Sequence, residues 1–317
     1  MIMKKTYVQL QLRAFRWAEG RRFYFTFSIL FVVAMLYRLL EARTDDPAFL
    51  RQLNQNPLGL KASVHHYAQE GRPMRYVEIG YDSLPLIVFV HGAPSSSAFW
   101  KSLLRDTQLL KRAKLLAVDR AGYGYSGYGI PEVSVERQAA LIAPILKVKR
   151  KIHPAIVLHG SSYGGTVTAR LAMDYPDLID GILLQSSSNK PEAETTYWIT
   201  HPTSHPWLRW LIPGSLRVAN AEKLAHADQL RAMEAGWERI KSAAIILHGL
   251  EDRLIFPDNA RYAYTRMKNA AFLQWKMVQG SRHDLLFTQR PLLVRSLLTL
   301  LDVTAKQAPF RHGQRKH

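Results

Sequence analysis

The sequence predicts an α/β fold built on one mostly parallel, eight-stranded β-sheet with helices on both faces. From about residue 61, short β-rich runs alternate with helical stretches, a pattern typical of parallel sheets. The runs LIVFV (86–90), AIVLH (155–159) and AAIIL (243–247) are apolar throughout, as central strands covered on both faces must be. With 317 residues, 47% of them apolar, the chain can bury such a sheet.

The individual elements follow from the same patterns. Strands are expected at Ala62–Tyr67, Tyr76–Ile79, Leu86–Val90, Leu115–Val118, Ile156–Leu158, Gly181–Leu184, Ala244–Leu247 and Phe272–Met277. Helices are expected at Ala98–Lys111, Val133–Leu146, Tyr163–Tyr175, Asn259–Lys268 and Pro291–Val303. The body of the fold is therefore residues 61–186 and 243–304, with a linker at 41–60 and a basic tail at 305–317.

The N-terminal region predicts a membrane anchor over residues 23–40. The run FYFTFSILFVVAMLY (23–37) is apolar except for Thr26 and Ser28, and Arg38 separates it from two further leucines. Eighteen helical residues span about 27 Å, enough to cross a bilayer with Arg38 extended toward the headgroups. A cleaved signal peptide and a packed or peripheral helix are the alternatives, but no small-x-small cleavage site follows the run.

The charge flanking this run predicts its orientation. Residues 1–22 carry six Lys and Arg against one Glu. By the positive-inside rule this basic segment stays in the cytoplasm. The large domain of this single-pass protein is then expected on the extracytoplasmic side, in the periplasm if the source is bacterial.

One long segment, residues 187–242, interrupts the alternation and predicts a helical cap inserted over the sheet. Its second half has apolar residues at helical spacing from Leu224 to Ile240, with Asn220 placed to cap the helix start. Four of the chain's seven tryptophans fall here, and they are either contacts for an apolar substrate group or packing residues: Trp198, Trp207, Trp210 and Trp237.

The segment Gly160-Ser161-Ser162-Tyr163-Gly164 is the main chemical signal. It follows an apolar strand and precedes a helix. A sharp turn between the two exposes the middle serine, and small residues at 160 and 164 keep the turn from clashing. The start of the following helix favours negative charge nearby. Ser162 is therefore a candidate nucleophile.

An acid and a base follow in the order such a nucleophile requires. Asp252 comes just after the strand 244–247, with Glu251 as its adjacent rival, and His283 follows the next strand. Ser162, Asp252 and His283 then form a candidate catalytic triad.

Two upstream segments complete a resemblance that covers residues 61–304. The strand 86–90 leads into His91-Gly92-Ala93-Pro94, and Asp119-Arg-Ala-Gly-Tyr-Gly-Tyr-Ser126 follows the next parallel strand. With the features above, the chain resembles the α/β-hydrolase family, specifically its members with an HGxP loop and a cap. Ala121 in place of a usual proline, and Ser161 before the nucleophile, depart from the family pattern.

This resemblance implies an oxyanion hole formed by the backbone N–H groups of Ala93 and Tyr163. It also implies an α/β-hydrolase fold and a serine hydrolase that cleaves a small-molecule or lipid-like carboxylic ester. Similar enzymes that open epoxides have an aspartate nucleophile, so Ser162 favours acyl transfer. A carbon–carbon bond hydrolase, an acyltransferase and a non-catalytic binding protein on this fold stay open as alternatives.

Several other function classes are disfavoured. The net charge of +18 comes from 43 Lys and Arg against 25 Asp and Glu, but half of it lies in the terminal segments, and no nucleic-acid-binding module is present. No cysteine occurs. His201 and His205 lie four residues apart between prolines, which argues against a helical metal site, and His91 and His159 are expected to be hydrogen-bonded loop or core residues. No cofactor motif is found.

Overall fold

The computed structural model describes residues 21–33, 45–198, 200–205, 207 and 212–313. The chain divides into two units, Met1–Glu41 and Ala42–His317. In the first, residues 21–33 form a helix whose apolar side chains, such as Phe23 and Phe31, are exposed. Within the described residues, no helix has both the length and the apolar character needed to cross a membrane. Residues 34–40 of the predicted anchor lie outside that part of the chain.

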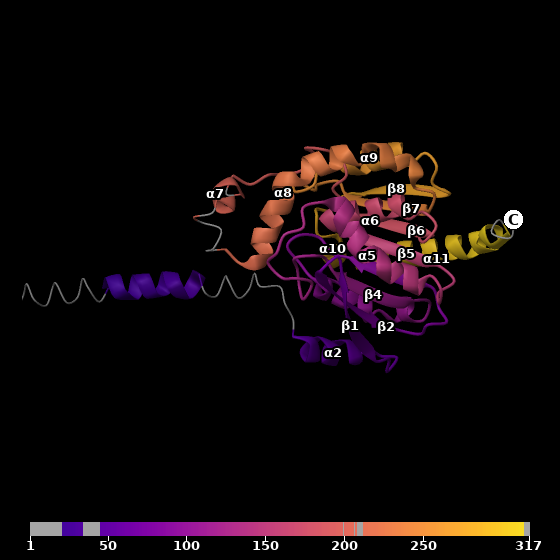
Figure 1. Cartoon of the computed structure of the whole chain (residues 1–317), viewed down its shortest axis with the longest axis horizontal. Helices are drawn as coiled ribbons and strands as arrows, with labels where there is room; N and C mark the ends of the chain where they lie inside the picture. Colours follow the sequence, from indigo (N-terminus) through magenta and orange to yellow (C-terminus); the bar gives the residue numbers. More distant parts are fainter. Residues whose placement is uncertain (1–20, 34–44, 199, 206, 208–211, 314–317) are drawn as a thin grey trace, which may run out of the picture. The chain divides into compact units, whose positions relative to one another are not determined.

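The second unit is built on one eight-stranded sheet (Figure 1). Its strands are β1 (Ala62–Gln69), β2 (Arg72–Ile79), β3 (Leu86–Val90), β4 (Lys114–Asp119), β5 (Ile156–Ser161), β6 (Gly181–Gln185), β7 (Ala243–Gly249) and β8 (Phe272–Val278). Their order across the sheet is β1-β2-β4-β3-β5-β6-β7-β8. Strand β2 pairs antiparallel with β1 and β4, and every later pairing is parallel.

The central strands alternate their side chains between two hydrophobic clusters, one on each face of the sheet. In β3, Leu86, Val88 and Val90 belong to one cluster, whereas Ile87 and Phe89 belong to the other. The period of two follows from the pleat, and burial on both faces explains why these strands are apolar throughout.

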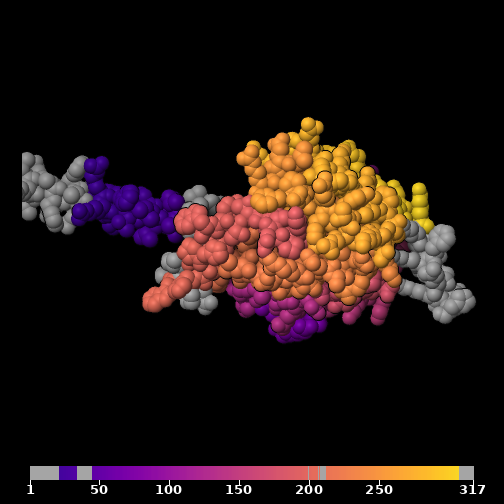
Figure 2. Space-filling view, turned by 90° about the horizontal axis from the view of Figure 1, so that it is seen from above, coloured from indigo at the N-terminus to yellow at the C-terminus, as the bar shows by residue number. Residues whose placement is uncertain are grey.

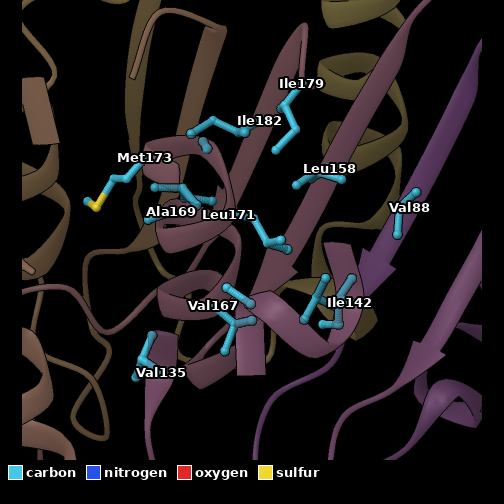
Figure 3. Packing of buried hydrophobic residues seen from close by; sticks show 14 of the residues in the cluster. Val88, Val135, Ile142, Leu158, Val167, Ala169, Leu171, Met173, Ile179 and Ile182 are labelled. Carbon is cyan, nitrogen blue, oxygen red and sulfur yellow. The ribbon is translucent and has the colours of Figure 1, made fainter. Parts of the chain in front are cut away.

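The helices divide between these two faces. On the first, α5 (Val135–Lys149), α6 (Tyr163–Asp174) and α9 (Asp258–Arg266) contribute to the core. Figure 3 shows Val167 and Leu171 of α6 beside Ile142 of α5 and Leu158 of β5. The opposite face is covered by α2 (Asp46–Asn54), η1 (Ser97–Trp100), α3 (Lys101–Leu104), α4 (Thr107–Leu110), α10 (Leu285–Thr288) and α11 (Arg290–Gly313).

All eight predicted strands are confirmed. Three predictions about the segments that cover the second face of the sheet, opposite α5, α6 and α9, are wrong. The expected linker 41–60 contains α2, which Asp45 caps by accepting from Ala48 N–H, and which buries Phe49 and Leu53. The single helix expected over Ala98–Lys111 is three short ones, because the Asp106 carboxylate caps a new helix at Thr107. The residues beyond 304, which were expected to form a tail, continue α11, and this helix ends at Gly313.

The segment 187–242 contains α7 (Thr200–Ser204), α8 (Gly214–Ala232) and η3 (Glu234–Arg239). Helix α8 begins six residues before Asn220, so the predicted cap position is wrong, and Asn220 instead donates to Thr203 Oγ1 at 2.6 Å. Its buried face holds Glu222 and His226, whereas Leu224 is 43% exposed. In Figure 2 this segment (salmon to orange) and the residues after β7 form one continuous face.

Candidate active site

Ser162 lies at the turn between β5 and α6, in a backbone conformation that side chains rarely adopt. Its φ and ψ angles are 55° and −128°, and it occupies the N-cap position of α6. The turn is held from both sides, because Ser162 N–H donates to Gln185 O at 3.0 Å and Gly165 N–H donates to Ser162 O at 2.9 Å. Such strain persists only where the surroundings fix it, and it is a feature of functional sites.

Crowding around this turn explains the glycines that flank the serine. A Cβ on Gly160 would lie 2.4 Å from Gly164 O and from Thr168 Oγ1. A Cβ on Gly164 would lie 2.2 Å from Val90 O, at the end of β3. The two glycines therefore allow α6 to begin directly against the neighbouring strand, which places Ser162 beside the loop that follows β3.

That loop, His91-Gly92-Ala93-Pro94, leaves the sheet next to Ser162. A Cβ on Gly92 would be 2.9 Å from Ser162 Cβ and 3.5 Å from its Oγ. Strand β3 pairs with β4 on one side and β5 on the other, so the chain order reverses here. Ligands in open α/β sheets bind at such a reversal, beyond the carboxyl ends of the strands.

Asp252 and His283 meet at the same edge of the sheet, from the ends of β7 and β8. His283 Nδ1 lies 2.7 Å from Asp252 Oδ2. The other carboxylate oxygen accepts from the N–H groups of Leu254 and Ile255, both at 2.9 Å. The rival acid, Glu251, is exposed, and its backbone N–H donates to Ser281 O. The geometry therefore pairs His283 with Asp252.

Asp252 is buried, which by itself raises the pKa of its carboxyl group. Hydrogen bonds from His248 and His283, with the charge of His283 and the N–H of Ile255, outweigh that burial and hold the pKa well below its usual range. His248 Nε2 lies 3.4 Å from Asp252 Oδ2 and 2.9 Å from Ile255 O. The carboxylate is therefore ionised, and it orients the His283 ring through Nδ1.

Ser162 lines two adjoining cavities, which share Ala93, Pro94 and Leu254. The first, of about 290 Å³, extends under α8 and includes Tyr163. The second, of about 220 Å³, includes His283 and the aromatic side chains of Phe99 and Phe287. Ser162 therefore lies with His283 in one cavity and with Tyr163 in the other, and Ala93 lines both.

Of the tryptophans expected as substrate contacts or packing residues, the three that the structure describes do not line either cavity. Trp198 and Trp207 are 80% and 79% exposed, and Trp210 lies outside the described residues. Trp237 is buried in the core, with its ring 6.1 Å from that of Tyr262. Trp237 is thus a packing residue, the second of the two roles that the sequence left open for it.

The residues of the larger cavity that the sequence analysis did not predict include Glu194, Lys223 and His226. Glu194 comes from the loop after β6, where an isolated β-bridge pairs it with Ile255. Lys223 and His226 lie one turn apart on α8. No motif or spacing links the loop to the helix, so only the fold shows that these three side chains meet.

A buried ion pair connects α8 to the loop after β4. Arg120 donates from Nη1 to Glu222 Oε1 at 2.5 Å, and neither side chain is exposed. Tyr123 and Gln138 also donate to the Glu222 carboxylate, at 2.6 and 2.8 Å. Arg120 in turn donates from Nε to His91 O at 2.8 Å, and its backbone N–H donates to His91 Nε2 at 3.0 Å. The expected core role of His91 is confirmed.

The described residues contain no group of three or more His, Asp or Glu side chains that could hold a metal ion. Their chemistry at Ser162 is that of a hydroxyl, an imidazole and a carboxylate.

Comparison with known proteins identifies the family. A sequence model described as "Alpha/beta hydrolase family" matches residues 87–296. The chain belongs to the alpha/beta hydrolase family. The expected fold of a mostly parallel eight-stranded sheet flanked by helices is confirmed.

Curated relatives resemble parts of this chain. It is 28% identical over 162 residues to "Epoxide hydrolase 4" of Mus musculus, covering 51% of this chain and 43% of that protein. It is 26% identical over 201 residues to "Protein ABHD8" of Homo sapiens, covering 54% of this chain and 45% of that protein. The matched region thus spans under half the length of either relative.

Solved structures share the fold over most of the chain. A putative lipase from Acinetobacter baumannii superposes with a TM-score of 0.61 at 18% identity, covering 84% of this chain and 99% of that one. A structure titled as a membrane phospholipase A and bacterial virulence factor has the same score and identity, covering 90% and 99%.

Proposed function

We propose that this hydrolase cleaves carboxylic esters through an acyl-enzyme on Ser162, with His283 as general base and Asp252 as its orienting acid. The observation that carries the proposal is the pairing of His283 Nδ1 with Asp252 Oδ2 at 2.7 Å, beside a strained serine that lines the same cavity as His283. With Nδ1 committed to the carboxylate, Nε2 is the nitrogen free to exchange a proton with Ser162.

The reaction begins with attack by Ser162 Oγ on the ester carbonyl carbon. His283 Nε2 accepts the Oγ proton as the new C–O bond forms, and negative charge develops on the carbonyl oxygen. In this proposal the N–H groups of Ala93 and Tyr163 donate to that oxygen. Preorganised donors of this kind contribute roughly 3–4 kcal/mol each to transition-state stabilisation.

The intermediate then collapses. The bond to the alcohol oxygen breaks, His283 gives its proton to that oxygen, and the acyl group stays on Ser162. A water molecule next gives a proton to His283 and attacks the acyl carbon. Breaking the bond to Oγ releases the carboxylic acid, and Oγ recovers its proton from His283.

The two cavities suggest where the parts of the ester lie. The alcohol must leave beside His283, which lines the cavity with Phe99 and Phe287. The acyl group then extends into the larger cavity under α8, on the side of Tyr163. Both cavities have largely apolar walls, which suits a small-molecule or lipid-like ester.

The residue at position 162 separates this proposal from epoxide opening, the activity named for one relative. Opening an epoxide through a covalent intermediate needs a carboxylate that attacks carbon and is later hydrolysed. A serine hydroxyl activated by histidine suits acyl transfer instead.

We propose in addition that residues 23–40 anchor the hydrolase in a membrane as a single pass, with the N-terminus in the cytoplasm and the catalytic domain on the other side. The uncharged run from Phe23 to Tyr37 and the six basic residues before it support this orientation. Protease protection in sealed vesicles tests it, since a catalytic domain digested from the cytoplasmic side would contradict the proposed topology.

The decisive experiment for catalysis is covalent labelling of the full chain, kept in detergent, with a fluorophosphonate. Intact mass should show one adduct, and Ser162→Ala should lose both the adduct and at least about 10³-fold of the turnover of simple esters. His283→Ala should slow labelling and turnover to a similar degree.

Ser161→Ala is the matched control, because it removes the neighbouring hydroxyl of the same turn. It should keep the adduct. Labelling that persists in Ser162→Ala, or a folded wild-type chain that gives no adduct and hydrolyses no ester, would overturn the proposed function.

A further inference from the structure

The larger cavity beside Ser162 has one charged wall, formed by Glu194, Lys223 and His226. These three residues are called the Glu194 cluster below. The rest of that cavity is largely apolar, with Leu216 and Ala219 from α8 and Leu254 and Ile255 from the loop after β7. A charged group at an otherwise apolar binding cavity fixes the orientation and the class of ligand.

The carboxylate of the Glu194 cluster is fully engaged by the protein. Glu194 Oε1 accepts from Lys223 Nζ at 2.7 Å and from His226 Nδ1 at 2.9 Å. Its Oε2 accepts from Ser188 Oγ at 2.9 Å. Burial raises the pKa of this carboxyl group, but its bond to His226 and the charges of His226 and Lys223 outweigh it and lower the pKa to about 2. Glu194 is therefore ionised and turned toward its donors.

His226 is 1% exposed and bonded through both ring nitrogens. Nδ1 faces the Glu194 carboxylate, which only accepts, so Nδ1 carries a proton. Nε2 lies 3.2 Å from Thr166 Oγ1, and Thr166 donates its own hydroxyl proton to Ser188 O. The His226 ring is tilted by 32° against that of Tyr163, with the ring centroids 4.5 Å apart.

Lys223 presents the remaining charge to the cavity. Its ammonium group has three N–H donors, and within the described part of the chain it gives one to Glu194. Its side chain is 20% exposed, against 11% for Glu194. The most accessible member of the Glu194 cluster is therefore a cation, and its ammonium group has donors beyond the one that it gives to Glu194.

No other ionisable side chain among the described residues lines this cavity, apart from the Tyr163 and Tyr197 hydroxyls. The neighbouring Glu222, also on α8, accepts hydrogen bonds from Arg120, Tyr123 and Gln138. An anionic ligand group in the cavity would therefore meet the Lys223 ammonium without facing a free carboxylate. A partly buried cation with unused donors is stabilised by such a group.

We propose that Lys223, held in place by Glu194, is an anion-binding residue of the larger cavity. The substrate is then an ester whose acyl part carries an anionic oxygen group, a carboxylate or a phosphate. This inference rests on the proposed ester hydrolysis at Ser162, and it adds the chemical class of the acyl group. The apolar residues between Ser162 and Lys223 then contact the carbon chain that joins the ester to the anion.

Three series of p-nitrophenyl esters of matched chain length test the inference, with acyl chains that end in a carboxylate, a phosphate monoester or a neutral methyl ester. The wild-type full chain should show a kcat/KM for at least one anionic series that exceeds the neutral series by about tenfold or more. The anionic series with the larger ratio identifies the group. Lys223→Met should reduce that ratio at least tenfold, and Lys223→Arg, which keeps the charge, should retain most of it.

Lys268→Met is the matched control, since it removes the same charge from an exposed pair with Glu238 far along the chain. It should leave kcat/KM unchanged for all three series. Thermal unfolding of each variant shows whether it is folded. An unaltered anionic-to-neutral ratio in a folded Lys223→Met, or a wild-type preference for the neutral esters, would overturn the anion site.

Failure of the two proposals gives different results. If Ser162 is labelled and neutral esters are hydrolysed, but the ratio is independent of Lys223, only the anion site is wrong. If no ester is hydrolysed and no adduct forms, the catalytic proposal is wrong. Calorimetric titration of the full chain with glutarate then tests the anion site by itself, because wild type should bind and Lys223→Met should not.

Discussion

Replacing Glu222 by alanine should destabilise the α/β unit more than any change at its surface. The carboxylate accepts from Arg120, Tyr123 and Gln138, and both it and Arg120 are fully buried. Without it the guanidinium keeps its charge in the core with no anionic partner. Removing one member of a buried pair in this way costs about 3–5 kcal/mol.

Equilibrium urea unfolding followed by circular dichroism measures this loss. The unfolding midpoint should fall while the slope with denaturant stays constant, because the same surface is exposed on unfolding. For a domain of this size each kcal/mol lowers the melting temperature by about 2–4 °C, so a total of roughly 6–20 °C is expected.

Two further variants decide whether the unpaired charge is the cause. Combining Glu222→Leu with Arg120→Met removes both charges, so the double variant should be more stable than Glu222→Ala alone. Asp302→Ala breaks an exposed pair with Arg112 and should cost less than about 1 kcal/mol. A Glu222→Ala protein within about 1 kcal/mol of wild type would refute the reasoning.

Two more predictions concern the site itself. Gly164→Ala places a Cβ 2.2 Å from Val90 O, so the loop after β3 must shift, and phosphonylation of Ser162 should slow at least about 10²-fold. Gly181→Ala is the control, because its Cβ meets only side chains, at 3.3 Å, and this variant should be labelled at the normal rate. Equal labelling rates for the two variants would contradict the crowding argument. Folding lowers the pKa of Glu194 from 4.5 to about 2, so ionisation of this carboxyl group stabilises the folded state above pH 4.5. About 3 kcal/mol of the free energy of unfolding is therefore lost as the pH falls from 4.5 to 2. Urea midpoints across that range should therefore fall less steeply for Glu194→Gln than for wild type, and parallel curves would show that Glu194 contributes nothing to acid sensitivity.

The sheet and the arrangement of the candidate site were accessible from the sequence because their signals are local. A strand buried on both faces must be apolar throughout, as Leu86–Val90 is. Ser162, Asp252 and His283 each follow a strand directly, and the parallel strands β5, β7 and β8 end at one edge of the sheet. Topology alone then brings the three residues to the same edge.

The features that were missed depend on contacts between distant segments. Helix α8 buries Glu222 and His226 because their partners, Arg120 and Glu194, come from other loops, and hydrophobic periodicity favours the wrong face of that helix. Composition left Trp237 open as a substrate contact or a packing residue, and only the fold shows that it packs in the core. Helix α2 is short, but Asp45 and Pro47 are capping signals that identify such a helix.

The position of α11 has a consequence for how the site is assembled during synthesis. This helix packs on β5, β6 and β7, directly beneath the strands that carry Ser162 and Asp252. Helix α11 is synthesised after every residue of the candidate site. The second hydrophobic face of the sheet therefore stays partly uncovered until α11 has left the ribosome. Such non-local pairing is slow to form and leaves apolar strands uncovered in the meantime. A nascent chain that contains Ser162 but not yet α11 therefore leaves the apolar face beneath β5, β6 and β7 uncovered.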